Sequence, residues 1–210
     1  MQDKKRGYSL VVLCMILLGS VGCQKNIPLD SLTAARKQNA SIQKSTQKLS
    51  LDEAIKQHKL AYADNLYLEY RGEHPDSSKT PAMILKLSKA HIREKEYLLA
   101  RYYAEAYITD YPDGKNVDQA WFLRLKALFL RFRSPGSVDS LGEQFEEEAV
   151  AFISDPFYRK YHAKVREMLK EAKKIQYQRN EALALYYEKL GKPKAAAFYR
   201  QKNKSLKKKK

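Results

Sequence analysis

Prolines that follow helical stretches recur along this chain and constrain its fold more than any other feature. Pro75, Pro112 and Pro156 lie 37 and 44 residues apart, and Asp follows or precedes each of them. Apolar residues between them have helical spacing. Ala, Leu, Lys, Glu, Arg and Tyr dominate, whereas Gly (8) and Pro (7) are scarce, which favours helix over sheet. A period of this size predicts stacked helical repeats.

The tetratricopeptide unit, about 34 residues of two helices with small residues where they cross, accounts for this period. The second unit carries the large–small pair Leu87 and Ser88 and then Tyr97 and Ala100. The first unit is weaker. The last unit carries the large, small, aromatic, turn and small positions in order, at Leu183, Ala184, Tyr187, Gly191 and Ala196. The longer third unit predicts an insertion, most simply at Ser134-Pro135-Gly136-Ser137, where Pro and Gly break the helix.

We therefore predict an all-α protein of tetratricopeptide-like antiparallel helix pairs stacked into a curved solenoid. The predicted helices cover residues 47–59, 61–73, 80–92, 95–110, 116–133, 139–154, 158–189 and 193–204.

The N-terminus has the layout of a secretory signal. Lys4, Lys5 and Arg6 precede an apolar run, small residues follow it, and Cys23 comes next. A cysteine directly after a small residue resembles a lipobox, so we predict cleavage before Cys23 and acylation of that cysteine, which anchors a protein strongly. An ordinary signal peptide or an uncleaved anchor is the alternative. Gln24, in place of Asp, favours sorting to the outer membrane.

These features divide the chain into four predicted parts: a signal peptide (1–22), a lipidated cysteine with a flexible tether (23–46), a helical domain (47–204) and a basic tail (205–210). Both cysteines lie within the first 23 residues, so no disulfide framework is expected in the helical domain. The net charge of +16 suits nucleic acid, an anionic membrane, an acidic partner or simply a solvated helical surface.

Catalytic signatures are missing from the sequence. The four histidines have no HExxH spacing, and GxSxG, P-loop and GxGxxG motifs do not occur. We expect the histidines to be structural or surface residues, and Glu146-Glu147-Glu148 to be a solvated face. The sequence therefore predicts a non-enzyme with no cofactor and no metal.

Several segments resemble the outer-membrane assembly lipoproteins of the BamD (ComL) family. They are Leu99-Ala100-Arg101-Tyr102-Tyr103, Tyr111-Pro112, Asn116-Val117-Asp118, Ala120-Trp121-Phe122-Leu123-Arg124, Phe157-Tyr158 and Ala184-Leu185-Tyr186-Tyr187-Glu188-Lys189-Leu190-Gly191. The resemblance implies a scaffold on the periplasmic face of the outer membrane, anchored by lipid. It would bind the POTRA region of the barrel subunit BamA and other assembly lipoproteins, and receive unfolded outer-membrane proteins.

The resemblance also implies where partners bind. A groove of the first units would receive substrate segments, and we expect its surface to include Tyr67, Tyr103, Tyr107, Trp121 and Arg124. The last helix pair would meet BamA, with Arg200 as the candidate contact; a solvated Arg200 is the alternative.

Two other functions stay open: a periplasmic tetratricopeptide lipoprotein of cell-wall or pilus assembly, and a DNA-binding competence lipoprotein. The chain has no aromatic or basic platform typical of a nucleic-acid module, so nucleic acid is not the expected partner.

Overall fold

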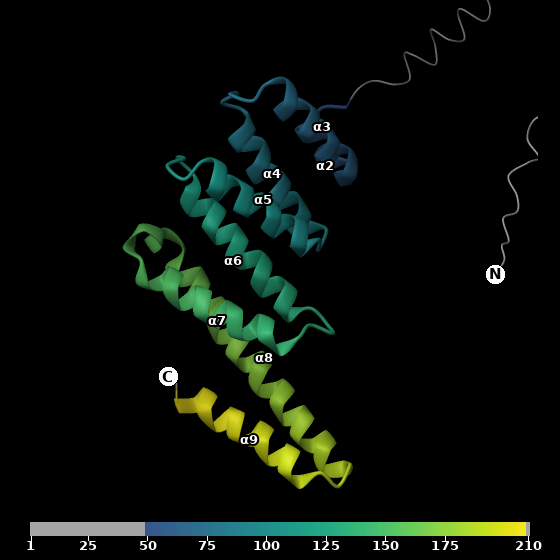
Figure 1. Ribbon diagram of the computed structural model, residues 1–210, viewed down its shortest axis with the longest axis vertical. Helices are drawn as coiled ribbons and strands as arrows, with labels where there is room; N and C mark the ends of the chain where they lie inside the picture. Colours follow the sequence, from purple (N-terminus) through teal and green to yellow (C-terminus); the bar gives the residue numbers. More distant parts are fainter. Residues whose placement is uncertain (1–48, 209–210) are drawn as a thin grey trace, which may run out of the picture. The chain divides into compact units, whose positions relative to one another are not determined.

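The computed structural model describes residues 49–208, and this part of the chain is helical, without a strand (Figure 1). The elements are α2 (Leu51–Lys56), α3 (Leu60–Glu73), α4 (Thr80–Arg93), α5 (Tyr97–Asp110), α6 (Val117–Arg133), α7 (Asp139–Ser154), a 3-10 helix (Pro156–Tyr161), α8 (His162–Lys189) and α9 (Pro193–Lys208). Consecutive helices pack as antiparallel pairs, and the pairs stack. The predicted all-α fold is confirmed. The predicted signal peptide, Cys23 and the tether lie outside the described residues.

Each helix pair reverses direction at a turn that holds one residue of positive φ. These residues are His58 (57°), Lys95 (64°), Gly136 (72°) and Gly191 (67°). Glycine adopts this conformation without steric cost, whereas His and Lys rarely do. The sequence therefore indicates the turn at Gly191 plainly and gives little sign of those at His58 and Lys95.

These turns explain where predicted helix ends were wrong. The helix predicted from 95 begins at Tyr97 because Lys95 belongs to the turn. Among the described residues, the helix predicted over 47–59 covers Leu51–Lys56: Ser50 starts it with a capping box to Glu53, and the turn at His58 follows.

At the C-terminal side, two further boundaries differ. The first residues of the helix predicted from 158 form part of the 3-10 helix, which Asp155 caps by accepting a hydrogen bond from the Phe157 amide at 2.9 Å. The last helix continues to Lys208 instead of ending at 204.

The extra length of the third pair is distributed along it. Helix α6 is three residues longer than α4, α7 is two longer than α5, and the turn over 134–138 is two longer than the turn over 94–96. These differences account for the whole seven-residue increase in spacing. The expectation of a local insertion at Ser134–Ser137 is thus only partly correct.

Two apolar clusters form the core of residues 49–208. The first joins α2 to the start of α6 and includes the fully buried Ala63, Ile84 and Leu87. The second joins α6, α7 and α8 around Phe132, Phe145 and other aromatic side chains. The predicted small positions of the second unit are confirmed: Ser88 and Ala100 are both fully buried, and the Ser88 hydroxyl donates to the Ala100 carbonyl at 2.8 Å.

Helix α8 extends past α7, and α9 folds back along its second half (Figure 1). Among the described elements, α8 is the only one whose backbone packs against α9. Their interface buries two small residues, Ala184 and Ala196, and two amides, Asn180 and Asn203. This terminal hairpin is therefore attached to the rest of the fold mainly through α8.

Candidate binding surfaces

The three tyrosines expected in a substrate groove lie inside the helix packing. Tyr67, Tyr103 and Tyr107 are only 2–4% exposed. The Tyr67 and Tyr103 rings meet edge to face with centroids 5.7 Å apart, and the Tyr107 hydroxyl accepts a hydrogen bond from the Asn116 amide at 3.3 Å. This corrects the expectation that they line an open groove: neighbouring helices cover these faces, so the rings hold helices together.

A buried polar network connects α3, α4 and α5 around His91, whose side chain is fully buried. Its Nε2 lies 3.0 Å from an Asp64 oxygen, and its Nδ1 lies 2.6 Å from Glu96. The same Asp64 oxygen accepts a hydrogen bond from the Tyr103 hydroxyl at 2.7 Å. The Tyr103 ring stacks on the imidazole, with centroids 5.3 Å apart.

Charges in this network set its protonation. Burial alone lowers the pKa of His91, but the hydrogen bonds and negative charges of Asp64 and Glu96 outweigh burial and leave that pKa raised. Burial, followed by the hydrogen bond to Asp64, raises the pKa of Tyr103, so its hydroxyl stays a donor. The geometry suits a structural role, as expected for the histidines.

Arg124 and Trp121 lie at the contact between the second and third pairs. Arg124 donates to Glu105 at 3.0 Å and to Glu148 at 2.7 Å, and its guanidinium stands 5.2 Å from the centre of the Trp121 ring. Arg101 pairs with the same two carboxylates, at 2.7 and 3.5 Å. These ion pairs connect α5, α6 and α7. In this fold, Arg124 therefore helps to hold the three helices together.

The sequence did not indicate the partners of Arg124. Glu148, expected on a solvated face, is only 20% exposed and closes this network. Burial alone raises the pKa of Glu105, but its hydrogen bonds to Arg101 and Arg124 outweigh burial and lower that pKa. Only the packing of α7 against α6 brings these charges together.

Exposed apolar side chains gather instead on the first turns of α5. Leu98 (60% exposed), Leu99 (44%) and Tyr102 (57%) are spaced so that they share one side of the helix. A shallow groove runs from Leu98 and Leu99 to Arg131 and Ser134 at the end of α6. Helical spacing could have indicated this exposure, because these positions lie on the side of the helix opposite the buried Ala100 and Ala104.

The terminal hairpin also carries exposed apolar side chains. Leu185, Tyr186, Leu190 and Phe198 are each about half exposed. Arg200 lies on the same hairpin and forms an ion pair with Glu188 of α8; both side chains are partly exposed. The Arg200 guanidinium is thus within reach of solvent and of any partner that covers the hairpin.

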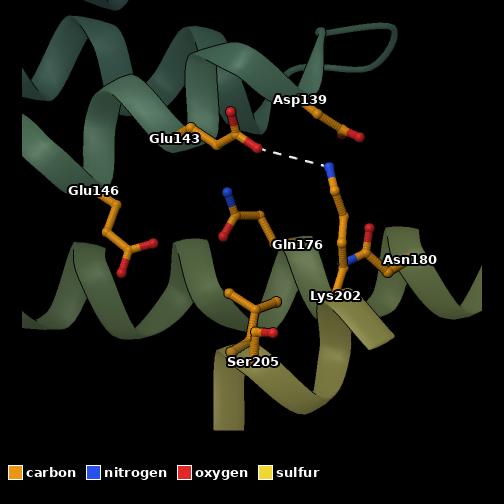
Figure 2. Close-up of a pocket in the computed structure, with 8 residues that line it drawn as sticks. Asp139, Glu143, Glu146, Gln176, Asn180, Lys202 and Ser205 are labelled. Carbon is orange, nitrogen blue, oxygen red and sulfur yellow. Dashed lines mark ion pairs between the residues drawn. The ribbon is translucent and has the colours of Figure 1, made fainter. Parts of the chain in front are cut away.

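A cavity of about 160 Å³, lined mainly by polar and charged residues, lies where α9 approaches α7 (Figure 2). Asp139, Glu143 and Glu146 line it from α7, Gln176 and Asn180 from α8, and Lys202, Ser205 and Leu206 from α9. The Lys202 ammonium lies 3.7 Å from Glu143 and neutralises part of this acidic wall. The side chains here bridge α7 and α9, whose backbones stay apart.

Every helix within residues 49–208 is too short or too polar to span a lipid bilayer. Within the same residues, no cluster of His, Cys, Asp and Glu has the arrangement of a metal site.

Comparison with known proteins identifies relatives of this chain. Residues 40–203, more than three quarters of the sequence, match the family model YfiO, described as outer membrane lipoprotein. The chain is 31% identical over 150 residues to the outer membrane protein assembly factor BamD of Helicobacter pylori (strain ATCC 700392 / 26695). This match covers 67% of the chain and 64% of the relative, a little under two thirds of that protein's length. The resemblance drawn from the sequence is confirmed, and the chain belongs to the YfiO family of outer membrane lipoproteins.

Proposed function

We propose that this protein is a scaffold of the β-barrel assembly machinery, held at the periplasmic face of the outer membrane by an acylated Cys23. It binds the POTRA region of BamA, acts beside other assembly lipoproteins and receives unfolded outer-membrane proteins. It catalyses no reaction. The observation that carries this proposal is the 150-residue match to a protein named as an outer membrane protein assembly factor.

The first experiment separates this function from its rivals. The lipoprotein is purified with its partners from detergent-solubilised membranes. Recovery of BamA supports the assembly function, whereas recovery of murein enzymes or a pilus secretin in its place assigns the protein to cell-wall or pilus assembly. Salt-dependent DNA binding that survives removal of the terminal lysines would favour the competence function.

Anchoring at Cys23 has a direct test. Mass spectrometry of the mature protein should find an acylated cysteine as its first residue. A mature N-terminus at another residue, or an unmodified Cys23, would contradict the anchor.

For the substrate surface we propose Leu98, Leu99 and Tyr102 with the groove toward the end of α6, in place of the buried tyrosines. Half-exposed apolar side chains on a rigid helix suit extended, partly apolar segments of unfolded barrel proteins. Because these side chains contribute little to the core, they can be changed without disrupting the fold.

The paired variant Leu98→Glu with Tyr102→Glu should weaken cross-linking of an unfolded barrel protein to the scaffold. Val150→Glu is the control, since Val150 is 50% exposed on α7 and lies outside the proposed surface. Equal cross-linking of both variants would place the substrate on another surface.

For BamA we propose a contact through Arg200. Arg200→Glu in the full-length lipoprotein should abolish co-purification with BamA, because losing one half of a charge pair that is buried in an interface costs about 2–5 kcal/mol. Glu188→Gln is the control: it breaks the same internal ion pair but keeps the arginine. If Arg200→Glu is folded and still recovers BamA, or if Glu188→Gln loses BamA equally, the contact is not Arg200.

A further inference from the structure

The charge of this protein is strongly segregated along the described fold. Residues 49–154, which form α2–α7, contain 14 Lys and Arg against 17 Asp and Glu, a net charge of −3. Residues 155–210 contain 18 against 5, a net charge of +13. The basic excess of residues 49–210 therefore lies after α7, in the 3-10 helix, α8, α9 and the residues that follow them.

Part of this excess forms an ordered stripe. Arg166, Lys170 and Lys174 occupy positions four residues apart on α8, so they follow one side of the helix. All three are exposed, and none makes an ion pair with an acidic side chain that the structure describes. Other cations, such as Arg101 and Arg124, have their charges neutralised within the fold.

Apolar side chains lie between these cations. Leu169, Tyr177 and Leu206 line the same shallow groove, which residues of α8 and the end of α9 form together. The sequence continues from Leu206 directly into Lys207-Lys208-Lys209-Lys210. We call Arg166, Leu169, Lys170, Lys174, Tyr177 and Leu206 the basic face.

We propose that the basic face binds the anionic phospholipid surface of the membrane to which the protein is anchored. Each Lys or Arg near an anionic bilayer contributes about 1 kcal/mol of binding, and long cationic side chains lay their methylene stems on apolar surface while the charge stays at the headgroups. Leu169, Tyr177 and Leu206 provide that apolar surface.

Two observations favour a membrane over an acidic protein. The cations follow an open stripe with no enclosed pocket to select a carboxylate, and a fluid lipid surface needs no matching shape. A membrane is also within reach, because 25 residues separate Cys23 from Leu49, a span of at most about 90 Å. This second argument rests on the proposed anchoring.

The test uses the mature chain with Cys23→Ser, made without the preceding 22 residues, so that no acyl chain contributes. Co-sedimentation is measured with vesicles of phosphatidylethanolamine and phosphatidylglycerol, and with vesicles of phosphatidylcholine alone. The protein with an unchanged basic face should bind the anionic vesicles, and this binding should weaken as the salt concentration rises. It should not bind the neutral vesicles.

Neutralising the stripe by Arg166→Gln, Lys170→Gln and Lys174→Gln should weaken binding to anionic vesicles about 100-fold, at about 1 kcal/mol for each lost cation. The control triple variant Lys59→Gln, Lys89→Gln and Arg93→Gln changes the net charge equally, at exposed sites on the N-terminal pairs. It should bind like the parent protein. Circular dichroism checks that both variants remain helical.

Equal weakening in both triple variants would overturn the proposal, because total charge and not the basic face would then govern binding. So would unchanged binding of the stripe variant. Deleting Lys207–Lys210 measures the share of the terminal lysines, and the stripe variant must still reduce binding in that shortened chain. Neither BamA nor an acyl chain is present in this test, so a negative result would leave the proposed assembly function unaffected. In the same way, a failure to recover BamA would not contradict membrane binding by the basic face.

Discussion

Helices α2–α7 share apolar cores that continue from one pair to the next, whereas the terminal hairpin joins its two helices through small residues and matched polar groups. In the first region, Phe132 and Phe145 are fully buried among other aromatic and aliphatic side chains. In the second, the buried residues are Ala184, Ala196 and the amides Asn180 and Asn203.

The amide contacts are specific. Asn180 donates to Asn203 at 3.0 Å, and Asn203 donates to the Tyr177 carbonyl at 3.2 Å and to Glu181 at 2.7 Å. The Tyr187 and Tyr199 rings stack beside them with centroids 5.6 Å apart. Because such an interface buries less apolar surface, we expect the hairpin to open locally at a lower free energy than the stacked pairs.

The largest expected effect is in the shared core. Phe132→Ala should lower the free energy of unfolding by about 3–5 kcal/mol, because it removes a fully buried ring and leaves a cavity. Urea unfolding followed by circular dichroism measures this loss. Phe198→Ala removes a ring that is 54% exposed on α9 and should have a much smaller effect. Similar losses in the two variants would show that the regions do not differ.

Asn203→Ala sharpens the comparison within the hairpin. It leaves Asn180 without its acceptor and should cost about 1–3 kcal/mol, the penalty for an unsatisfied buried amide. Hydrogen exchange should quicken in α9 and the second half of α8, while α4 and α5 keep their protection. Lys204→Ala, at the exposed neighbouring position, is the control. Equal loss of protection in every helix would mean that the hairpin opens only with the whole domain.

The stacked pairs should also respond to pH through His91. Its pKa is raised in the fold above the ordinary value of 6.5, so protonation stabilises the folded state. This stabilisation is fully present below the unfolded pKa and is lost as pH rises through the raised folded pKa, with a slope of at most about 1.4 kcal/mol per pH unit. Unfolding free energies across this range measure it. His91→Gln should remove this component, and an unchanged pH profile in that variant would rule it out.

The smallest effect concerns the surface of the hairpin. Glu188→Gln breaks the ion pair with Arg200, and because both side chains are more than a third exposed, the loss should be at most about 1 kcal/mol. The same urea titration suffices. A larger loss would mean that this pair, and not the amide and tyrosine contacts, holds α9 in place.

Local sequence determined the helices and most of the repeat pattern. The prolines mark the boundaries between pairs, Ser88 and Ala100 occur where two helices cross, and Gly191 forms the last turn. These signals are readable because backbone preference and helical spacing act over a few residues. Predictions from the same signals were wrong at the helix ends near His58 and Lys95. Both residues have a positive φ in turns between packed helices, a conformation that His and Lys rarely adopt.

Tertiary structure alone decided which aromatic and charged residues are available to partners. Tyr102 is exposed and the adjacent Tyr103 is buried. Both are tyrosines on the same helix, so the sequence alone makes each a plausible groove residue. His91 contacts Asp64, which is 27 residues away in the sequence, and Arg124 contacts Glu148, which is 24 residues away. A side chain's burial and its long-range partners depend on which neighbouring helix covers its face, and that is fixed only when the pairs stack.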